Sequence, residues 1–183
     1  MAVTSRPART SGASALWLRL VPWLGTALRL LLGIVFVVAG STKVTDLAAS
    51  GRAVNAYQLM PFGAAKVVGA ALPLVEITVG GLLILGLATR VMAILTGGLL
   101  AVYIFGISSV WVRGLSIDCG CFSQGGQLAP GQHPNYLWDL VRDVLLLLAA
   151  LFVVVYPRTR IAVDGWLLGE NVVEDDDSTE DDQ

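Results

Sequence analysis

Charged residues are scarce in this chain. Asp, Glu, Lys and Arg make up 14% of its 183 residues, whereas they make up roughly 25% of an average soluble domain. Hydrophobic residues account for 55% of the sequence, the mean hydropathy is +0.72, and the apolar residues form runs close to the ~20 residues that span a bilayer. This composition excludes a water-soluble fold of this size. It predicts an all-α integral membrane protein in contact with the lipid bilayer.

The chain also lacks the residue patterns of several enzyme classes. It contains a single histidine, His133, and we find no glycine-rich phosphate-binding loop, no Ser/His/Asp arrangement and no pair of metal-binding histidines. A hydrolase or an ATP-driven pump is therefore not supported. The formal net charge is −2, but acidic residues gather between Glu174 and Asp182 and leave the rest of the chain basic. The charge therefore gives no reason to expect a nucleic-acid partner.

Four apolar segments have the length of membrane spans. We expect these spans at about residues 24–40, 67–87, 91–111 and 137–156, within one four-helix membrane domain that covers residues 16–168. Pro22 lies near the expected start of the first helix. A signal peptide is disfavoured there because the apolar stretch exceeds the ~7 to 15 residues of a signal core and contains Arg29. Both tails, basic residues 1–15 and acidic residues 169–183, should be disordered.

Two long polar loops separate these spans. Residues 41–66 should form the first loop, with a short surface helix, and residues 112–136 the second. Only residues 88–90 separate the second span from the third, which predicts an antiparallel helical hairpin with a tight turn. Glycines recur through the spans and should allow the helices to approach closely.

Basic residues near the span ends predict the orientation, because they favour the cytoplasmic side. The side that carries both termini has Arg6, Arg9, Arg19, Arg90, Arg158 and Arg160, and the opposite side has Lys43, Arg52, Lys66 and Arg113. We therefore expect a multi-pass protein of the plasma membrane, with both termini in the cytoplasm and both loops outside it.

Two cysteines are the most distinctive feature of the second loop. Cys119 and Cys121 are the only cysteines of the chain, and Gly120 separates them. Residues at this spacing can satisfy the limit of about 7 Å between the Cα atoms of a disulfide, and the small ring should be strained and easily exchanged. The pair therefore predicts redox chemistry outside the cytosol. A structural disulfide, two unreactive thiols or a metal pair completed by carboxylates or a second subunit are the alternatives.

Charged residues in and beside the spans form a second group of candidates, because a charge in lipid is costly and usually functional. Arg29 lies in the first span and Glu76 in the second, and the spacing of Asp139, Arg142 and Asp143 in the fourth lets the arginine pair with both acids. These charges either hold the helices together or line a polar pocket beneath the cysteines. The candidate pocket residues are Lys43, Glu76, Asp118, Asp139, Arg142 and Asp143. Arg113 or His133 could also fold close to the thiols.

Several motifs together resemble the DoxX-like/MauE group of small four-helix membrane proteins. They are Arg29 to Gly33 and Gly40 to Lys43 in the first span, Pro73 to Glu76, Gly80–Gly81 and Leu85 to Leu87 in the second, and Asp118 to Phe122 in the loop. The resemblance covers roughly residues 24–157, and Ser123 stands where the group often has glycine. It implies a redox-associated role, such as the maturation of extracytoplasmic proteins in methylamine utilisation.

The cysteine count limits how such a protein can work. We expect thiol–disulfide exchange between the Cys119/Cys121 pair and an extracytoplasmic thioredoxin-like partner. With two cysteines the chain cannot pass electrons between two internal pairs, so a second protein or a membrane quinone must reset the pair. A quinone is expected near Lys43, Glu76 and Arg142. A non-enzymatic assembly or scaffold subunit and a small-solute transporter are the alternatives.

Overall fold

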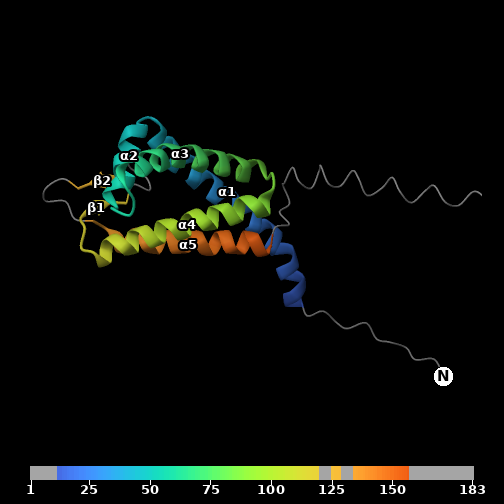
Figure 1. Ribbon diagram of the computed structural model, residues 1–183. Coiled ribbons are helices and arrows are strands. Elements are labelled where there is room, and N and C mark those ends of the chain that lie inside the picture. The colour runs from blue at the N-terminus through green and yellow to red at the C-terminus, as the bar shows by residue number, and fades with distance from the viewer. Residues whose placement is uncertain (1–11, 120–124, 129–133, 157–183) are drawn as a thin grey trace, which may run out of the picture.

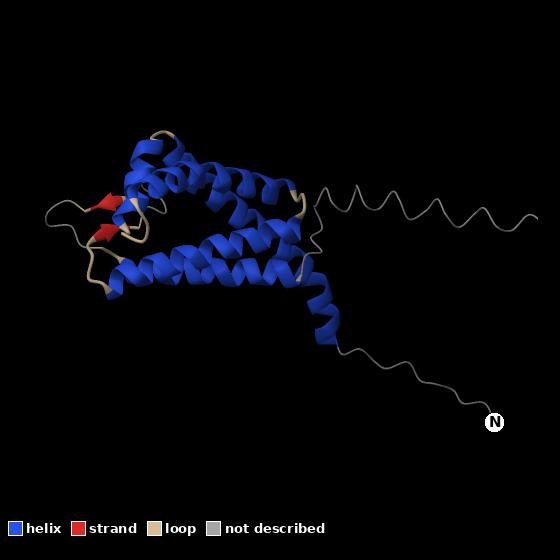
Figure 2. Ribbon diagram, viewed as in Figure 1, coloured by secondary structure: helices blue, strands red, loops and turns tan. Residues whose placement is uncertain are grey.

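Helices dominate the computed structural model, which describes residues 12–119, 125–128 and 134–156 (Figure 2). The elements are α1 (Gly12–Val44), α2 (Leu47–Ala56), α3 (Phe62–Leu85), α4 (Thr89–Val112), β1 (Ile117–Asp118), β2 (Gly126–Gln127) and α5 (Tyr136–Val155). The predicted all-helical class is confirmed. The short antiparallel hairpin of β1 and β2 is an addition that the sequence pattern did not predict.

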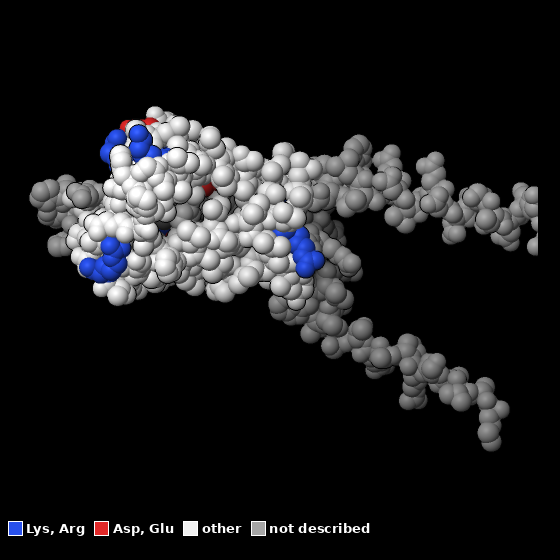
Figure 3. Space-filling model, viewed as in Figure 1, with Lys and Arg blue, Asp and Glu red and all other residues white. Residues whose placement is uncertain are grey.

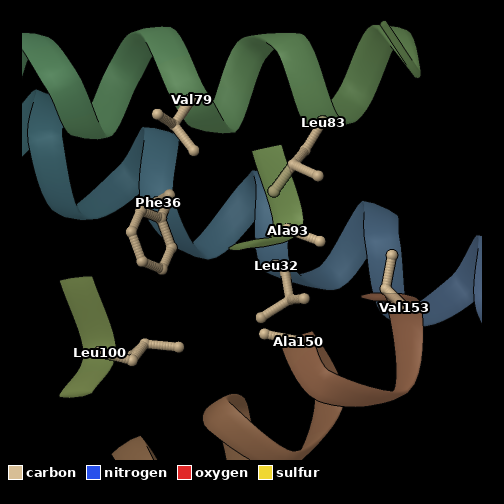
Figure 4. Close-up of a cluster of buried hydrophobic side chains, with 8 residues drawn as sticks. All are labelled: Leu32, Phe36, Val79, Leu83, Ala93, Leu100, Ala150 and Val153. Atoms are coloured by element: carbon tan, nitrogen blue, oxygen red, sulfur yellow. The ribbon is translucent and has the colours of Figure 1, made fainter. Parts of the chain in front are cut away.

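The four long helices lie side by side, with α1 packed against α3 and α4 packed against α5 (Figure 1). Helix α2 and the β1–β2 hairpin lie at one end of the helices, and the turn between α3 and α4 lies at the other end. All four long helices contribute to one apolar core, whose side chains point toward one another in Figure 4: Leu32, Phe36, Val79, Leu83, Ala93, Leu100, Ala150 and Val153.

Three helices are long and apolar enough to cross a membrane: the Leu20–Val44 part of α1, α3 and α4. Their outer faces carry large apolar side chains, such as Val67, Val102 and Phe105, which are more than half exposed. So large an apolar surface is unusual for a protein in water and suits contact with lipid. Helix α5 has 20 residues, but it carries three charged residues in its first half. The chain is thus a membrane protein with several apolar helices.

Helix α1 begins earlier than its sequence suggests. The first span is expected from residue 24 with Pro22 near the helix start, but α1 begins at Gly12 and continues through Pro22. The residues around this proline are mainly Ala, Leu, Trp and Arg, which favour helix and offset the one backbone hydrogen bond that proline removes. At its other end α1 extends to Val44, so Lys43 belongs to its last turn.

Glycines bring α1 and α3 to backbone distance. A Cβ atom on Gly33 would lie 2.8 Å from the carbonyl oxygen of Gly80, and one on Gly40 would lie 2.7 Å from that of Pro73. Neither backbone oxygen can move aside, so only glycine fits at these positions. The expected role of glycine in close packing is confirmed here, whereas Gly81 and Gly98 face open space.

Helix α2 is more buried than the surface helix that the sequence predicts. Its first turn is capped by the Asp46 carboxylate, which accepts a hydrogen bond from the backbone N–H of Ala49 at 2.8 Å. The helix then packs on α3, where a Cβ atom on Gly69 would lie 2.6 Å from the Cα atom of Gly51. These two glycines allow α2 to lie directly against α3 and bury its inner face.

The turn between α3 and α4 is as tight as predicted. Helix α3 ends at Gly86, whose φ of 73° is in the left-handed region that favours glycine. The N–H groups of Gly86 and Leu87 both donate to the carbonyl of Leu82, at 2.9 and 3.1 Å. Ala88 then adopts a second left-handed conformation, with φ of 45°, and α4 begins at Thr89. The two helices therefore form an antiparallel hairpin.

Candidate functional site

A buried ion pair joins α1 to α3 near the end that carries α2. The Lys43 ammonium donates to both carboxylate oxygens of Glu76, with Nζ–Oε distances of 2.9 and 3.0 Å. Lys43 is 6% exposed and Glu76 1%. Gly40 lies one turn before Lys43, and a Cβ atom there would lie 3.1 Å from the Cβ of Glu76. The close approach of α1 and α3 at Gly40 therefore allows the pair to form.

Tyr103 of α4 adds a third helix to this pair. Its hydroxyl donates a short hydrogen bond to Oε1 of Glu76, and the Nζ of Lys43 lies 5.7 Å from the centre of its ring. The Glu76 carboxylate thus accepts hydrogen bonds from both an ammonium and a phenol. Tyr103 is not among the site residues that the sequence predicts. Its hydroxyl within an otherwise apolar span was the available signal, because a buried phenol usually has a partner.

A pocket of about 140 Å³ lies beside this triad and reaches the cysteine loop. Lys43 and Tyr103 line it together with Tyr57 and Cys119, and most of its remaining walls are apolar side chains of α2, α3 and α4. In Figure 3 the middle of the surface is almost free of charged side chains, and a small acidic area shows in the hollow between α3 and α4. The pocket therefore connects the buried ion pair to the predicted redox loop.

Two tyrosines hold the cysteine loop against the helices. The Tyr57 hydroxyl donates to the backbone carbonyl of Cys119 at 2.7 Å. The Tyr136 hydroxyl accepts from the N–H of Ile117 at 2.8 Å and donates a short bond to the carbonyl of Leu115. β1 pairs with β2 just before Cys119, with Asp118 opposite Gly126. The position of Cys119, which is partly buried, is thus fixed by contacts on both sides.

Of the other residues expected near the thiols, one lies in the described structure beside Tyr57 and two lie outside it. Arg113 donates to the carbonyl of Tyr57 at 2.8 Å and to the side chain of Gln58 at 3.2 Å, so it reinforces the same junction. Cys121 and His133 lie outside the described residues. Within the described ranges, no group of three or more His, Cys, Asp and Glu residues could hold a metal ion.

The charged cluster of α5 forms the ion pairs that its spacing predicts. Arg142 contacts Asp139 at 3.1 Å and Asp143 at 2.9 Å. These residues do not line the pocket beside Cys119. Asp143 instead faces a separate cavity of about 20 Å³, which it shares with Glu76 and Tyr103. The cavity is large enough for one water molecule.

The expected single polar pocket is therefore two separate cavities, and Tyr103 lines both of them. Lys43, Tyr103 and Cys119 line the larger pocket, and Asp143 lies beyond the small cavity on α5. A quinone is predicted from the sequence near Lys43, Glu76 and Arg142. Of these three residues only Lys43 lines the larger pocket. Arg142 is paired with Asp139 and Asp143 on α5.

The region of the chain that matches a known protein family includes nearly all of these elements. The sequence model of the family described as "Methylamine utilisation protein MauE" matches residues 21–156, from α1 to the end of α5. The chain belongs to the MauE family. The MauE resemblance that the sequence motifs indicate is thereby confirmed.

One curated MauE protein shows the extent of the similarity. The "Methylamine utilization protein MauE" of Paracoccus denitrificans is 35% identical to the chain over 101 residues, which are 54% of this chain and 54% of the relative. The chain thus aligns with about half the length of this curated MauE protein. No solved structure matches the chain.

Proposed function

We propose that this MauE-family protein catalyses thiol–disulfide exchange at the outer surface of the plasma membrane, through Cys119 and Cys121. The observation that carries the proposal is the position of Cys119, which lines a pocket together with the buried Lys43 and Tyr103. A thiol at such a place lies beside groups that can hold and move protons, which thiol oxidation requires. A purely structural loop would not need them.

The exchange between the cysteine pair and a partner disulfide needs no further oxidant or reductant. One thiolate of the pair attacks a partner disulfide, a mixed disulfide forms, and one partner sulfur leaves as a thiol. The second cysteine then attacks the mixed disulfide, which leaves the pair oxidised and the partner reduced. The reverse sequence oxidises a partner dithiol. A thioredoxin-like protein outside the cytoplasm is the partner that we propose, because its own exposed dithiol can take part in either direction.

The proposed topology has four membrane spans. Helix α5 is the fourth, because its 20 residues match a bilayer and its only basic residue is paired with two acids. Four spans put both termini on one side of the membrane and α2 and the β1–β2 hairpin on the other, and in our proposal the termini are on the cytoplasmic side. The greater number of arginines on the terminal side of the sequence supports this orientation.

The biological setting of the exchange is part of the same proposal. The Paracoccus denitrificans relative is named for methylamine utilisation. We propose that this chain serves the maturation of disulfide-containing extracytoplasmic proteins, as in methylamine utilisation.

Single-cysteine variants test the exchange. Cys121→Ser and Cys119→Ser should each trap a partner as a mixed disulfide that a reducing agent releases and mass spectrometry identifies. The matched control is the Cys119→Ser/Cys121→Ser double variant, which should trap nothing. Full function of this double variant in cells would refute the exchange and favour a scaffold subunit instead. Labelling of intact cells with a membrane-impermeant alkylating reagent tests the proposed side of the membrane.

A further inference from the structure

We propose that the pocket between α2, α3 and α4 binds the ring of a membrane quinone, which accepts the electrons of the dithiol. This inference rests on the proposed exchange for its source of electrons. The binding site itself rests on described residues alone: the size and walls of the pocket, its opening, and the ammonium group of Lys43.

The size and walls of the pocket suit a substituted six-membered ring. Its volume is about 140 Å³, and an apolar protein cavity of ~150 Å³ is known to take up benzene. Leu72 of α3, Ala53 of α2 and Val102 of α4 contribute apolar walls. Tyr57 and Tyr103 also line the pocket, and their aromatic rings can pack on a flat ligand.

The pocket opens where a lipid-soluble ligand can enter. Val68 of α3 and Val102 of α4 both line it, and they are 40% and 63% exposed. Both residues belong to helices that are apolar enough to cross a membrane. An opening between such helices faces the lipid, so a quinone with an isoprenoid tail could insert its ring and leave its tail in the bilayer.

Lys43 supplies the polar contact that distinguishes a quinone from a lipid chain. An ammonium group has three N–H donors. Two of them bond to the Glu76 carboxylate, and within the described part of the chain the third has no oxygen acceptor, only the face of the Tyr103 ring, whose centre is 5.7 Å from Nζ. Because Lys43 lines the pocket, this third donor can reach a ring oxygen there. A hydrocarbon chain would leave the donor without an acceptor in a buried site, which is costly.

The electron balance is complete with this ligand. The two thiols of the dithiol lose two electrons and two protons and form one disulfide bond, and the quinone gains both electrons and both protons to become a quinol. Lys43 would hold the ring oxygen as it gains charge, and Glu76 would keep the ammonium in place. Electrons therefore leave the protein partner through the dithiol and pass to the quinone.

Photolabelling tests the binding site independently of activity. The probe is a short-chain azido-ubiquinone, applied to the full chain in lipid nanodiscs and mapped by mass spectrometry. We expect labelling of α2, α3 or α4 around the pocket, and competition by decylubiquinone but not by decanol. Equal competition by decanol would mean an acyl-chain site and overturn the inference. Labelling spread over the outer faces without competition would overturn it as well.

Two valines of α4 provide a matched pair of variants. Val102→Phe narrows the pocket and should weaken probe binding about 10-fold. Val91→Phe, at a residue that is also more than half exposed but does not line the pocket, should leave binding unchanged. Ala53→Leu narrows the pocket from α2 and should act like Val102→Phe. Wild-type binding by both pocket variants would overturn the inference.

Mixed-disulfide trapping separates this inference from the proposed function. Partner trapping without competed labelling would overturn the quinone site and leave the exchange in place. Competed labelling at the pocket without partner trapping would support the site and count against the exchange.

Discussion

Helix α3 packs against α1 with glycine at the interface, but it faces α4 across a pocket. On the α1 side, a Cβ atom on Gly80 would lie 2.7 Å from the carbonyl oxygen of Gly33. On the α4 side, a tyrosine hydroxyl bridges to Glu76 beside a cavity of about 140 Å³. The two interfaces share one residue, Glu76, which bonds to Lys43 of α1 and Tyr103 of α4. Close packing with α1 therefore holds the buried acid, and its two partners, Lys43 and Tyr103, line the pocket on the other side.

Removal of the shared acid should have the largest effect on stability. Glu76→Leu leaves the Lys43 ammonium buried without its carboxylate, and such a loss costs about 3–5 kcal/mol of unfolding free energy. Unfolding in mixed detergent micelles measures it. The Lys43→Met/Glu76→Leu double variant should recover most of the loss, since no charge is left without a partner. An equal loss in both variants would show that the ion pair does not explain the effect.

Leucine-to-alanine substitution should lower the unfolding free energy more in the close-packed core than at the pocket wall. Leu83 is fully buried in the core. Leu83→Ala should lower the unfolding free energy by about 2 kcal/mol. This is near the lower end of the usual range, because lipid tails are apolar and moving a side chain from lipid into the core gains less than moving it from water. Leu72 lines the pocket and is partly exposed. Leu72→Ala should cost less than about half as much, since fewer contacts are lost. Equal losses in the same unfolding measurement would contradict the difference between the two interfaces.

A pair of adjacent glycines tests the close approach of α1 and α3. Gly80→Ala would place its Cβ against the backbone of α1 and should destabilise the protein by about 1–3 kcal/mol. Gly81→Ala is the matched control, because nothing lies within 4 Å of its added Cβ. Alanine there should be neutral or stabilising by up to about 1 kcal/mol, as expected for a helix interior. A similar stability of the two variants in detergent unfolding would contradict the observed packing.

The smallest effect is expected for a charge pair outside both interfaces. Arg52 lies 3.7 Å from Asp46, and their side chains are 64% and 45% exposed. Arg52→Ala should change the unfolding free energy by less than about 0.5 kcal/mol, since exposed pairs contribute little. Asp46→Ala should cost more, about 1 kcal/mol, because Asp46 also caps α2. A larger loss for Arg52→Ala than for Asp46→Ala would contradict this ranking.

The sequence predicts the helices and the important charges better than their surroundings. Glu76 and the charged cluster of α5 can be identified from the sequence, because a charge in an apolar span is costly. The spacing of Arg142 from the two acids predicts both of its ion pairs. The position of Tyr103 at the pocket could not be predicted in the same way. Helices α3 and α4 carry apolar residues around most of their circumference, so their sequences do not indicate which side faces a neighbour. The position of the pocket depends on that rotation.

The short turn from Gly86 to Ala88 also bears on how the protein is made. So few residues cannot cross a bilayer, so α3 and α4 cannot enter the membrane at separate times from opposite sides. The ends of α3 and α4 that meet at the turn therefore lie on the same side of the bilayer, and the two helices are inserted as an antiparallel pair. Because α5 follows α4 in the chain, residues of the α3–α4 interface are held near one another by the turn before α5 is synthesised.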